Sequence, residues 1–262
     1  KRQLNEIILD PDDYIKKIRE WYPKDTTYKV TLSFILGIFK YNKKLQTDYE
    51  KEYEKWLEAF KEADSTVNKR YETNAPTKRQ VDGYVPYDKI IKARDEQPIG
   101  SIRRLLLGFY TYLKPMRLEY AKVALYKDKS KVPDEPEANY IILKPGRLII
   151  THFKTRKHHD SYDILLPKPL LEDLNTSLEK EPREWLFVNA KNEPFSPALY
   201  SSWTMRHFKA IFKKPLTVAL IRHSFINTLD FNQLSISEKK EIALAMGHTV
   251  ETQDRYRLIF DD

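Results

Sequence analysis

A short β-type stretch inside an otherwise helical sequence is the feature that most constrains the fold. Residues 138–167 read "ANYIILKPGRLIITHFKTRKHHDSYDILLP" and hold three runs rich in β-branched and aromatic residues, at about 138–143, 147–153 and 161–166. Pro145 and Gly146 predict a tight turn between the first two runs. The segment "KTRKHHD" predicts a longer, basic turn before the third. We therefore expect a small antiparallel sheet whose second hairpin has a cationic tip.

Helical periodicity and helix-start signals dominate the sequence on both sides of this stretch. Asp10 before Pro11 predicts an N-cap, and Thr47 with Glu50 predicts a capping box. Later helices are expected in "IGSIRRLLLGFYTYL", "LYSSWTMRHFKAIF", "TVALIRHSFINTL", "SISEKKEIALAMGH" and, last and shortest, "ETQDRYRLIF". The fold class that follows is mainly α with a small antiparallel β-sheet, α+β as a whole.

A polar segment with proline and glycine divides the chain. "TNAPTKRQVDGYVPYDKI" interrupts the helical pattern that covers roughly the first 75 residues. Such a loss of periodicity marks a linker between separately packed regions. We therefore expect two domains, a helical one at 1–79 and a mixed one at 80–262.

Composition restricts the classes of partner and chemistry. The chain has 262 residues, 41% of them hydrophobic, and a formal net charge of +8. An excess of cations favours acidic partners, nucleic acid first and an anionic membrane surface second. The sequence has no cysteine, which excludes disulfides and thiolate metal sites. The lack of cysteine fits an intracellular protein, and we expect it in the nucleus or cytoplasm. No apolar run is long enough for a membrane span, and no signal peptide is visible.

Several side chains able to act on a phosphodiester lie beyond the predicted linker. They occur in a definite order along the chain. Arg117 follows a helix end in "LKPMRLEY", Lys154 and Lys157 lie in the basic hairpin, Arg222 and His223 lie in "LIRHSF", His248 follows Gly247, and Tyr256 stands between two arginines.

This order resembles that of the tyrosine recombinases, the family of site-specific recombinases and integrases. The most specific pieces are "IRHSF" and "MGHTVETQDRYR", and the resemblance extends over the whole chain. It implies a helical core-binding domain that clamps duplex DNA, followed by a catalytic domain. "KPMRLEY" and "MGHTVETQDRYR" are most similar to enzymes of large DNA viruses and their associated mobile elements.

The chemistry that the resemblance implies also has a physical basis. Tyr256 would attack a scissile phosphate and form a covalent 3′-phosphotyrosine. Arg117 and Arg222 would grip the non-bridging oxygens, and His248 would donate a further hydrogen bond. Lys154 would protonate the departing 5′-oxygen as a general acid. Rejoining would need neither metal nor cofactor, because the bond energy is kept in the phosphotyrosine.

Some assignments have alternatives. Lys114 is an alternative to Arg117. Many family members have the sequence "TGLR" in this element, and "TYLK" aligns with it so that Lys114 stands at the arginine position. The proline at 115 and the acid at 119 favour Arg117. Lys157 competes with Lys154. The family usually has His or Lys three residues before the second arginine, where this chain has Ala219.

Four further histidines could act in catalysis or bind a metal. His223 is a second catalytic candidate, although we favour a structural hydrogen bond to backbone. His152, His158 and His159 lack nearby carboxylates in a ligand pattern, so we expect solvated or phosphate-facing side chains rather than a metal site.

Three functions remain open at this stage. The first is site-specific recombination or integration, with four copies assembling on double-stranded DNA through a Holliday junction. The second is DNA relaxation by a type IB topoisomerase, which shares this catalytic layout. The third is a non-catalytic DNA-binding relative. Only six residues follow Tyr256, so we expect either a trimmed C-terminus or assembly through another surface.

Overall fold

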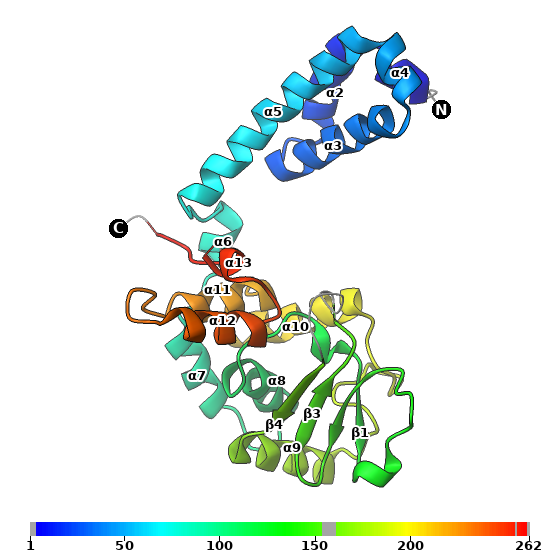
Figure 1. Ribbon diagram of the computed structural model, residues 1–262. Helices are drawn as coiled ribbons and strands as arrows, with labels where there is room; N and C mark the ends of the chain where they lie inside the picture. Colours follow the sequence, from blue (N-terminus) through cyan, green and yellow to red (C-terminus); the bar gives the residue numbers. More distant parts are fainter. Residues whose placement is uncertain (1–3, 154–160, 255, 261–262) are drawn as a thin grey trace. The chain divides into compact units, whose positions relative to one another are not determined.

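The computed structural model describes residues 4–153, 161–254 and 256–260, and side chains from Glu6 onward. The chain divides into two compact units, Lys1–Ala75 and Pro76–Asp262. Each is described by itself below (Figure 1). Among the described residues, no helix is both long and apolar enough to span a bilayer.

Unit 1 consists of helices. They are α1 (Leu4–Ile8), α2 (Pro11–Trp21), α3 (Asp25–Tyr41), α4 (Lys43–Asp48) and α5 (Glu50–Glu72). Asp10 caps α2 as expected, its carboxylate accepting from the amide of Asp13 at 3.3 Å. The core is aromatic and aliphatic: Trp56 is fully buried and donates its indole N–H to the carbonyl of Ile8 at 2.9 Å.

The expected capping box at Thr47 and Glu50 is wrong. Thr47 lies in the last turn of α4, and its hydroxyl donates to the carbonyl of Lys43 at 3.0 Å. Asn42 instead caps α4, and α5 begins at Glu50 without a side-chain cap. The pattern failed because a separate short helix ends just where the box was expected to start one.

Unit 2 holds a four-stranded sheet and the remaining helices. The helices are α6 (Lys78–Gly83), α7 (Tyr87–Asp95), α8 (Ile102–Thr111), α9 (Lys168–Lys180), α10 (Pro197–Phe212), α11 (Val218–Ile226), α12 (Ile236–Ala245) and α13 (Val250–Asp254), with 3₁₀ turns η1 (Glu119–Ala121) and η2 (Lys129–Lys131). The strands are β1 (Val123–Tyr126), β2 (Asn139–Ile142), β3 (Arg147–Ile150) and β4 (Tyr162–Leu165).

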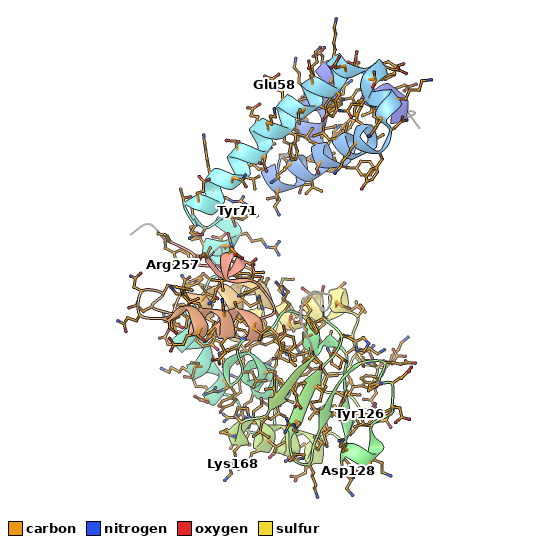
Figure 2. All side chains as sticks on the ribbon, in the orientation of Figure 1. Glu58, Tyr71, Tyr126, Asp128, Lys168 and Arg257 are labelled. Atoms are coloured by element: carbon orange, nitrogen blue, oxygen red, sulfur yellow. The ribbon has the colours of Figure 1, made fainter. Side chains whose placement is uncertain are left out.

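The α+β fold class is confirmed, with one correction to the sheet. The three expected strands are present as β2, β3 and β4 and pair antiparallel. A fourth strand, β1, pairs parallel to β2, so the sheet is mixed in the order β1-β2-β3-β4. Tyr126 at the end of β1, labelled in Figure 2, packs its ring against Tyr140 on β2 at 5.8 Å between centroids.

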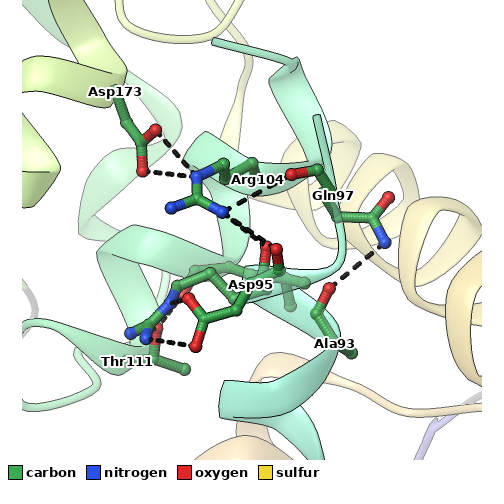
Figure 3. A network of polar contacts seen from close by, with 8 residues as sticks. Ala93, Asp95, Gln97, Arg104, Thr111 and Asp173 are labelled. Carbon is green, nitrogen blue, oxygen red and sulfur yellow. Dashed lines mark hydrogen bonds and ion pairs between the residues drawn. The ribbon is translucent and has the colours of Figure 1, made fainter. Parts of the chain in front are cut away.

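Helix α8 forms the centre of unit 2. Its residues 105–110 are all buried, because the helix contacts α7 on one side and α9 on another. A polar network fixes these three helices together (Figure 3). Arg104 on α8 donates its Nε–H to both carboxylate oxygens of Asp173 on α9, at 2.8 and 2.9 Å. Its Nη1 donates to carbonyls near the C-terminus of α7, including that of Asp95 at 3.2 Å.

The last expected helix is mostly absent. α13 ends at Asp254, and residues 256–260 have no helical assignment. Burial alternates along them: Leu258 is buried, Tyr256 and Phe260 are half-buried, and Arg257 and Ile259 are exposed. An alternation of this kind is typical of an extended segment lying on a surface.

Candidate active site

Arg222 lies in the core of unit 2, with an exposed fraction of 1%. Helix α11, capped by Thr217, carries it inward among apolar neighbours. Its Nη1 donates to the carbonyls of Pro115 at 2.8 Å and Met246 at 2.9 Å, and its Nη2 to Nδ1 of His248 at 2.8 Å. A buried guanidinium without such partners would cost several kcal/mol, so these acceptors make its position possible.

The hydrogen bonds of this guanidinium leave its Nε–H without a partner among the described residues. Arginine has five N–H donors, of which three are bound as above. The two that remain are the Nε–H, which has no partner in the described part of the chain, and one N–H of Nη2. In arginine the Nε–H lies parallel to one N–H of Nη2, and this edge is the one that binds two oxygens of a phosphate or carboxylate. The side chain of Tyr256 also acts on Arg222 through a hydrogen bond that raises the pKa of Arg222.

Burial lowers the pKa of Arg222, and the nearby Arg117 lowers it further, while Tyr256 acts in the opposite direction. Arginine nevertheless stays charged at working pH. The charge is therefore held in a largely water-excluded position, where its attraction to an anion is stronger than at a surface.

His248 is placed by the end of α12. Gly247 has φ of +68°, a conformation that glycine adopts without a steric penalty, and the amide of His248 donates back to the carbonyl of Ala243 at 3.0 Å. The side chain is buried, with 4% exposed. Burial, followed by the charges of Arg222 and Arg117, lowers its pKa to about 3, so the ring is neutral near pH 7.

The tautomer of His248 follows from its partner. Arg222 can only donate, so Nδ1 of His248 accepts and the ring proton is on Nε2. This Nε2 is buried and has no partner among the described residues. His248 thus holds an uncharged N–H donor in the same cluster as Arg222.

Arg117 joins the same cluster from the segment after α8. Its Nη1 donates to the carbonyl of Gly247 at 2.5 Å, and its own carbonyl accepts from the hydroxyl of Tyr110 at 3.0 Å. Lys114, the alternative, forms an ion pair with Glu241 on α12 at 3.1 Å. Arg117 therefore contacts the segment that carries His248, whereas the Lys114 side chain is paired with α12.

Tyr256 completes the cluster. Its ring centroid lies 5.1 Å from that of His248 in a stacked arrangement, 4.7 Å from that of His223, and 4.8 Å from Cζ of Arg222. The neighbouring Arg257, labelled in Figure 2, is exposed. The structure thus brings together Tyr256, Arg222, His248 and Arg117, which are spread over 140 positions of the sequence.

His223 lies beside this cluster and has both ring nitrogens engaged. Its Nδ1 donates to the carbonyl of Tyr256 at 2.6 Å, because a carbonyl only accepts. Its Nε2 faces the side-chain amide of Gln80 at 3.5 Å. Burial lowers the pKa of His223, partly offset by the bond to the Tyr256 carbonyl. Ala219, one turn earlier on α11, is exposed and offers no proton donor.

Lys154 and Lys157 lie outside the described residues, as do His158 and His159. The base of their hairpin is described, where the ring of Phe153 packs against that of Tyr162 at 4.9 Å between centroids. His152 is exposed, with its Nδ1 2.9 Å from the hydroxyl of Thr151. In the part of the chain with assigned structure, no group of three or more His, Asp or Glu could hold a metal ion.

Buried side-chain atoms without a partner in the described residues belong to Arg222 and His248, which were site candidates from the sequence, and to four residues that were not: Glu119, Tyr120, Tyr162 and Gln253. The pKa of Tyr162 is raised by burial and by the charge of Glu119 and lowered by the charge of Arg117. Buried unsatisfied atoms are uncommon in folded proteins, and a catalytic role is one explanation for them.

Comparisons with known proteins were made for the whole chain. No family model matches the sequence, and no curated protein does. Among solved structures, a XerA recombinase is similar over 99% of this chain and 95% of its own, with 15% identity and a TM-score of 0.43. A lambda integrase dimer bound to a COC′ core site is similar over 89% of this chain and 66% of its own, with 18% identity and a TM-score of 0.41. A lambda integrase tetramer bound to a Holliday junction has the same coverage and identity and a TM-score of 0.38.

Proposed function

We propose that this chain cleaves and rejoins DNA strands through a 3′-phosphotyrosine at Tyr256, as a site-specific recombinase or integrase of the tyrosine recombinase type. One observation carries the proposal. A phenol, a buried guanidinium whose Nε–H has no partner among the described residues and a neutral imidazole N–H meet in one place. A phosphodiester offers the complementary group, an anion with two non-bridging oxygens.

Each described side chain has a role in this reaction. The oxygen of Tyr256 loses its proton to water and attacks the phosphorus, and the bond to the 5′-oxygen breaks. Arg222 and Arg117 stabilise the charge that concentrates on the non-bridging oxygens, and His248 donates to one of them without adding charge. Lys154 or Lys157 would protonate the leaving oxygen. Attack by a 5′-hydroxyl reverses the steps and rejoins the strand.

The distribution of charge supports binding to DNA mainly through unit 2. Residues 1–75 contain 15 Lys and Arg against 14 Asp and Glu, whereas residues 76–262 contain 31 against 24. Contacts to phosphates give affinity that does not depend on sequence and that falls steeply with salt. In this proposal both units contact the duplex, and four copies assemble on paired DNA sites.

The test is covalent capture of DNA. The protein is incubated with a nicked duplex that carries the candidate site, in EDTA, and separated on a denaturing gel. We expect a slowly migrating protein–DNA species that is lost in Tyr256→Phe and kept in Tyr41→Phe, a matched control at a tyrosine that is 90% exposed. Absence of this species on every DNA tried would leave a binding-only protein.

The second candidate, a type IB topoisomerase, shares the same site geometry. The two are separated by the product. Joining of strands from two different duplexes identifies a recombinase, whereas relaxation of a supercoiled plasmid at independent sites, without strand exchange, identifies a topoisomerase.

A further inference from the structure

Residues 256–260 contact the rest of unit 2 through every second residue, namely Tyr256, Leu258 and Phe260. The carbonyl of Tyr256 accepts from His223, as described above. Leu258 is bound twice by one side chain: the amide of Asn227 donates to its carbonyl at 2.8 Å, and its N–H donates to Oδ1 of Asn227 at 2.9 Å. Phe260 packs its ring on that of Tyr84 at 4.5 Å between centroids.

His223 and Asn227 lie one helical turn apart, on α11 and at its C-cap. Residues spaced by four project from the same face of a helix. An asparagine side chain has the donor and acceptor of a peptide group, so it pairs with an extended chain as a neighbouring strand would. Together the two side chains define where the segment lies along α11.

We propose that His223 and Asn227 are positioning residues that fix the register of the Tyr256 segment, and that His223 takes no part in proton transfer. The inference rests on the proposed function for its catalytic consequence. Its physical reason is that in-line attack tolerates little displacement: a shift of about 1 Å can cost on the order of 10²-fold in rate.

The same helix supplies the phosphate-binding Arg222, directly before His223. The guanidinium of Arg222 and the carbonyl of Tyr256 are therefore fixed to adjacent residues of one rigid element. The Nδ1–H of His223 donates to the Tyr256 carbonyl, and Nε2 of His223 faces the side-chain amide of Gln80. Neither nitrogen is therefore free to exchange a proton with substrate. This distinguishes it from His248, whose Nε2–H is unbound in the described residues.

The test uses variants that separate hydrogen bonding from titration. In His223→Asn, the amide nitrogen stands in the place of Nδ1 and can still donate to Tyr256, but nothing titrates. In His223→Leu the donor is lost. Asn227→Leu removes both bonds to Leu258 and keeps the branching at Cγ and the number of side-chain heavy atoms. The measurement is the single-turnover rate of covalent DNA capture, with DNA affinity and thermal unfolding measured in parallel.

We expect His223→Leu and Asn227→Leu to lower the capture rate about 10²-fold with little change in DNA affinity, and His223→Asn to restore most of the rate with an unchanged pH profile. The effects of the two Leu variants should not add, because both act on one segment. The inference is overturned if His223→Asn is as slow as His223→Leu, or if all three variants react at the wild-type rate.

A second readout keeps the inference separate from the proposed function. Hydrogen exchange at the amide of Leu258 reports the Asn227 bond directly, without DNA. We expect Asn227→Leu to accelerate this exchange and His223→Asn to leave it unchanged. If the wild type captures no DNA but Leu258 behaves in this way, the proposed reaction fails while the anchoring holds. Equal rates of exchange at the Leu258 amide in the wild type and Asn227→Leu would show that Asn227 does not hold this segment.

Discussion

Acid should destabilise this protein through His248, and the size of the effect can be worked out. An unfolded histidine has a pKa near 6.5, whereas the buried ring of His248 has a pKa of about 3. As the pH falls through this window, His248 is protonated in the unfolded state but stays neutral in the folded state. Stability from His248 is complete above pH 6.5 and is lost between about 6.5 and 3.

The magnitude follows from 1.36 kcal/mol for each pKa unit. The whole window corresponds to about 5 kcal/mol, and a fall to pH 5 removes about 2 kcal/mol. The variant His248→Asn isolates this amount, because the asparagine oxygen can still accept from Arg222 but the side chain does not titrate. His223 also has a pKa lowered by burial, but it contributes equally to both proteins.

The assay is urea unfolding of wild type and His248→Asn at pH 7.5 and pH 5, with the free energy of unfolding taken at each pH. We expect the wild type to lose about 2 kcal/mol more than the variant between the two pH values. Equal losses would show that the ring is protonated as easily in the folded protein as in the unfolded chain. The neutral donor that we assign to His248 would then be wrong.

Three further predictions concern single side chains. Arg222→Lys keeps the charge but loses the two-pronged edge, so covalent capture should fall by about 10²- to 10³-fold in a single-turnover gel assay. Arg117→Ala should lower the capture rate by a similar factor. Lys114→Ala breaks only a surface ion pair and should leave the capture rate within about twofold of the wild type. The opposite ranking would move the proposed role from Arg117 to Lys114. Asp173→Asn breaks the buried ion pair between α8 and α9 and should lower the free energy of unfolding in urea by about 3 kcal/mol. The control Asp163→Asn breaks an exposed pair and should lower it by less than about 1 kcal/mol. Equal losses would contradict the role given to the buried pair.

Elements with strong local signals were predictable from the sequence. The Asp10 cap and the three strands of the hairpins appear where expected. Strand β1 was not predicted, because four residues without alternation carry no clear period, and its pairing partner β2 begins 13 positions later. Parallel pairing depends on the rest of the fold rather than on any local pattern.

The end of the chain shows how two periods can compete. "ETQDRYRLIF" was assigned to one helix, yet helix stops at Asp254 and the burial then alternates. The alternation of Tyr256, Leu258 and Phe260 was present in the sequence. It was too short to decide the matter without Asn227, whose role depends on a contact 31 positions away.

The site residues could be named in order, but their arrangement could not. Sequence order led to Arg222, His248 and Tyr256, which the structure brings together. It gave no sign that Gln253 would be fully buried with both amide atoms unpartnered among the described residues. Burial of a single polar side chain depends on packing from several elements, which no short pattern records.

The three bonds that Arg222 makes inside the protein have a consequence for how activity could be lost over time. This side chain ties together the segments of Pro115, Met246 and His248, so its replacement would leave three buried acceptors unpaired and weaken the whole unit. Loss of the Tyr256 hydroxyl would leave these three acceptors paired with Arg222. On the proposed function, a descendant that no longer cuts DNA would therefore tend to keep the arginine for stability and lose the tyrosine first. In related sequences the tyrosine would be the sharper marker of a working enzyme.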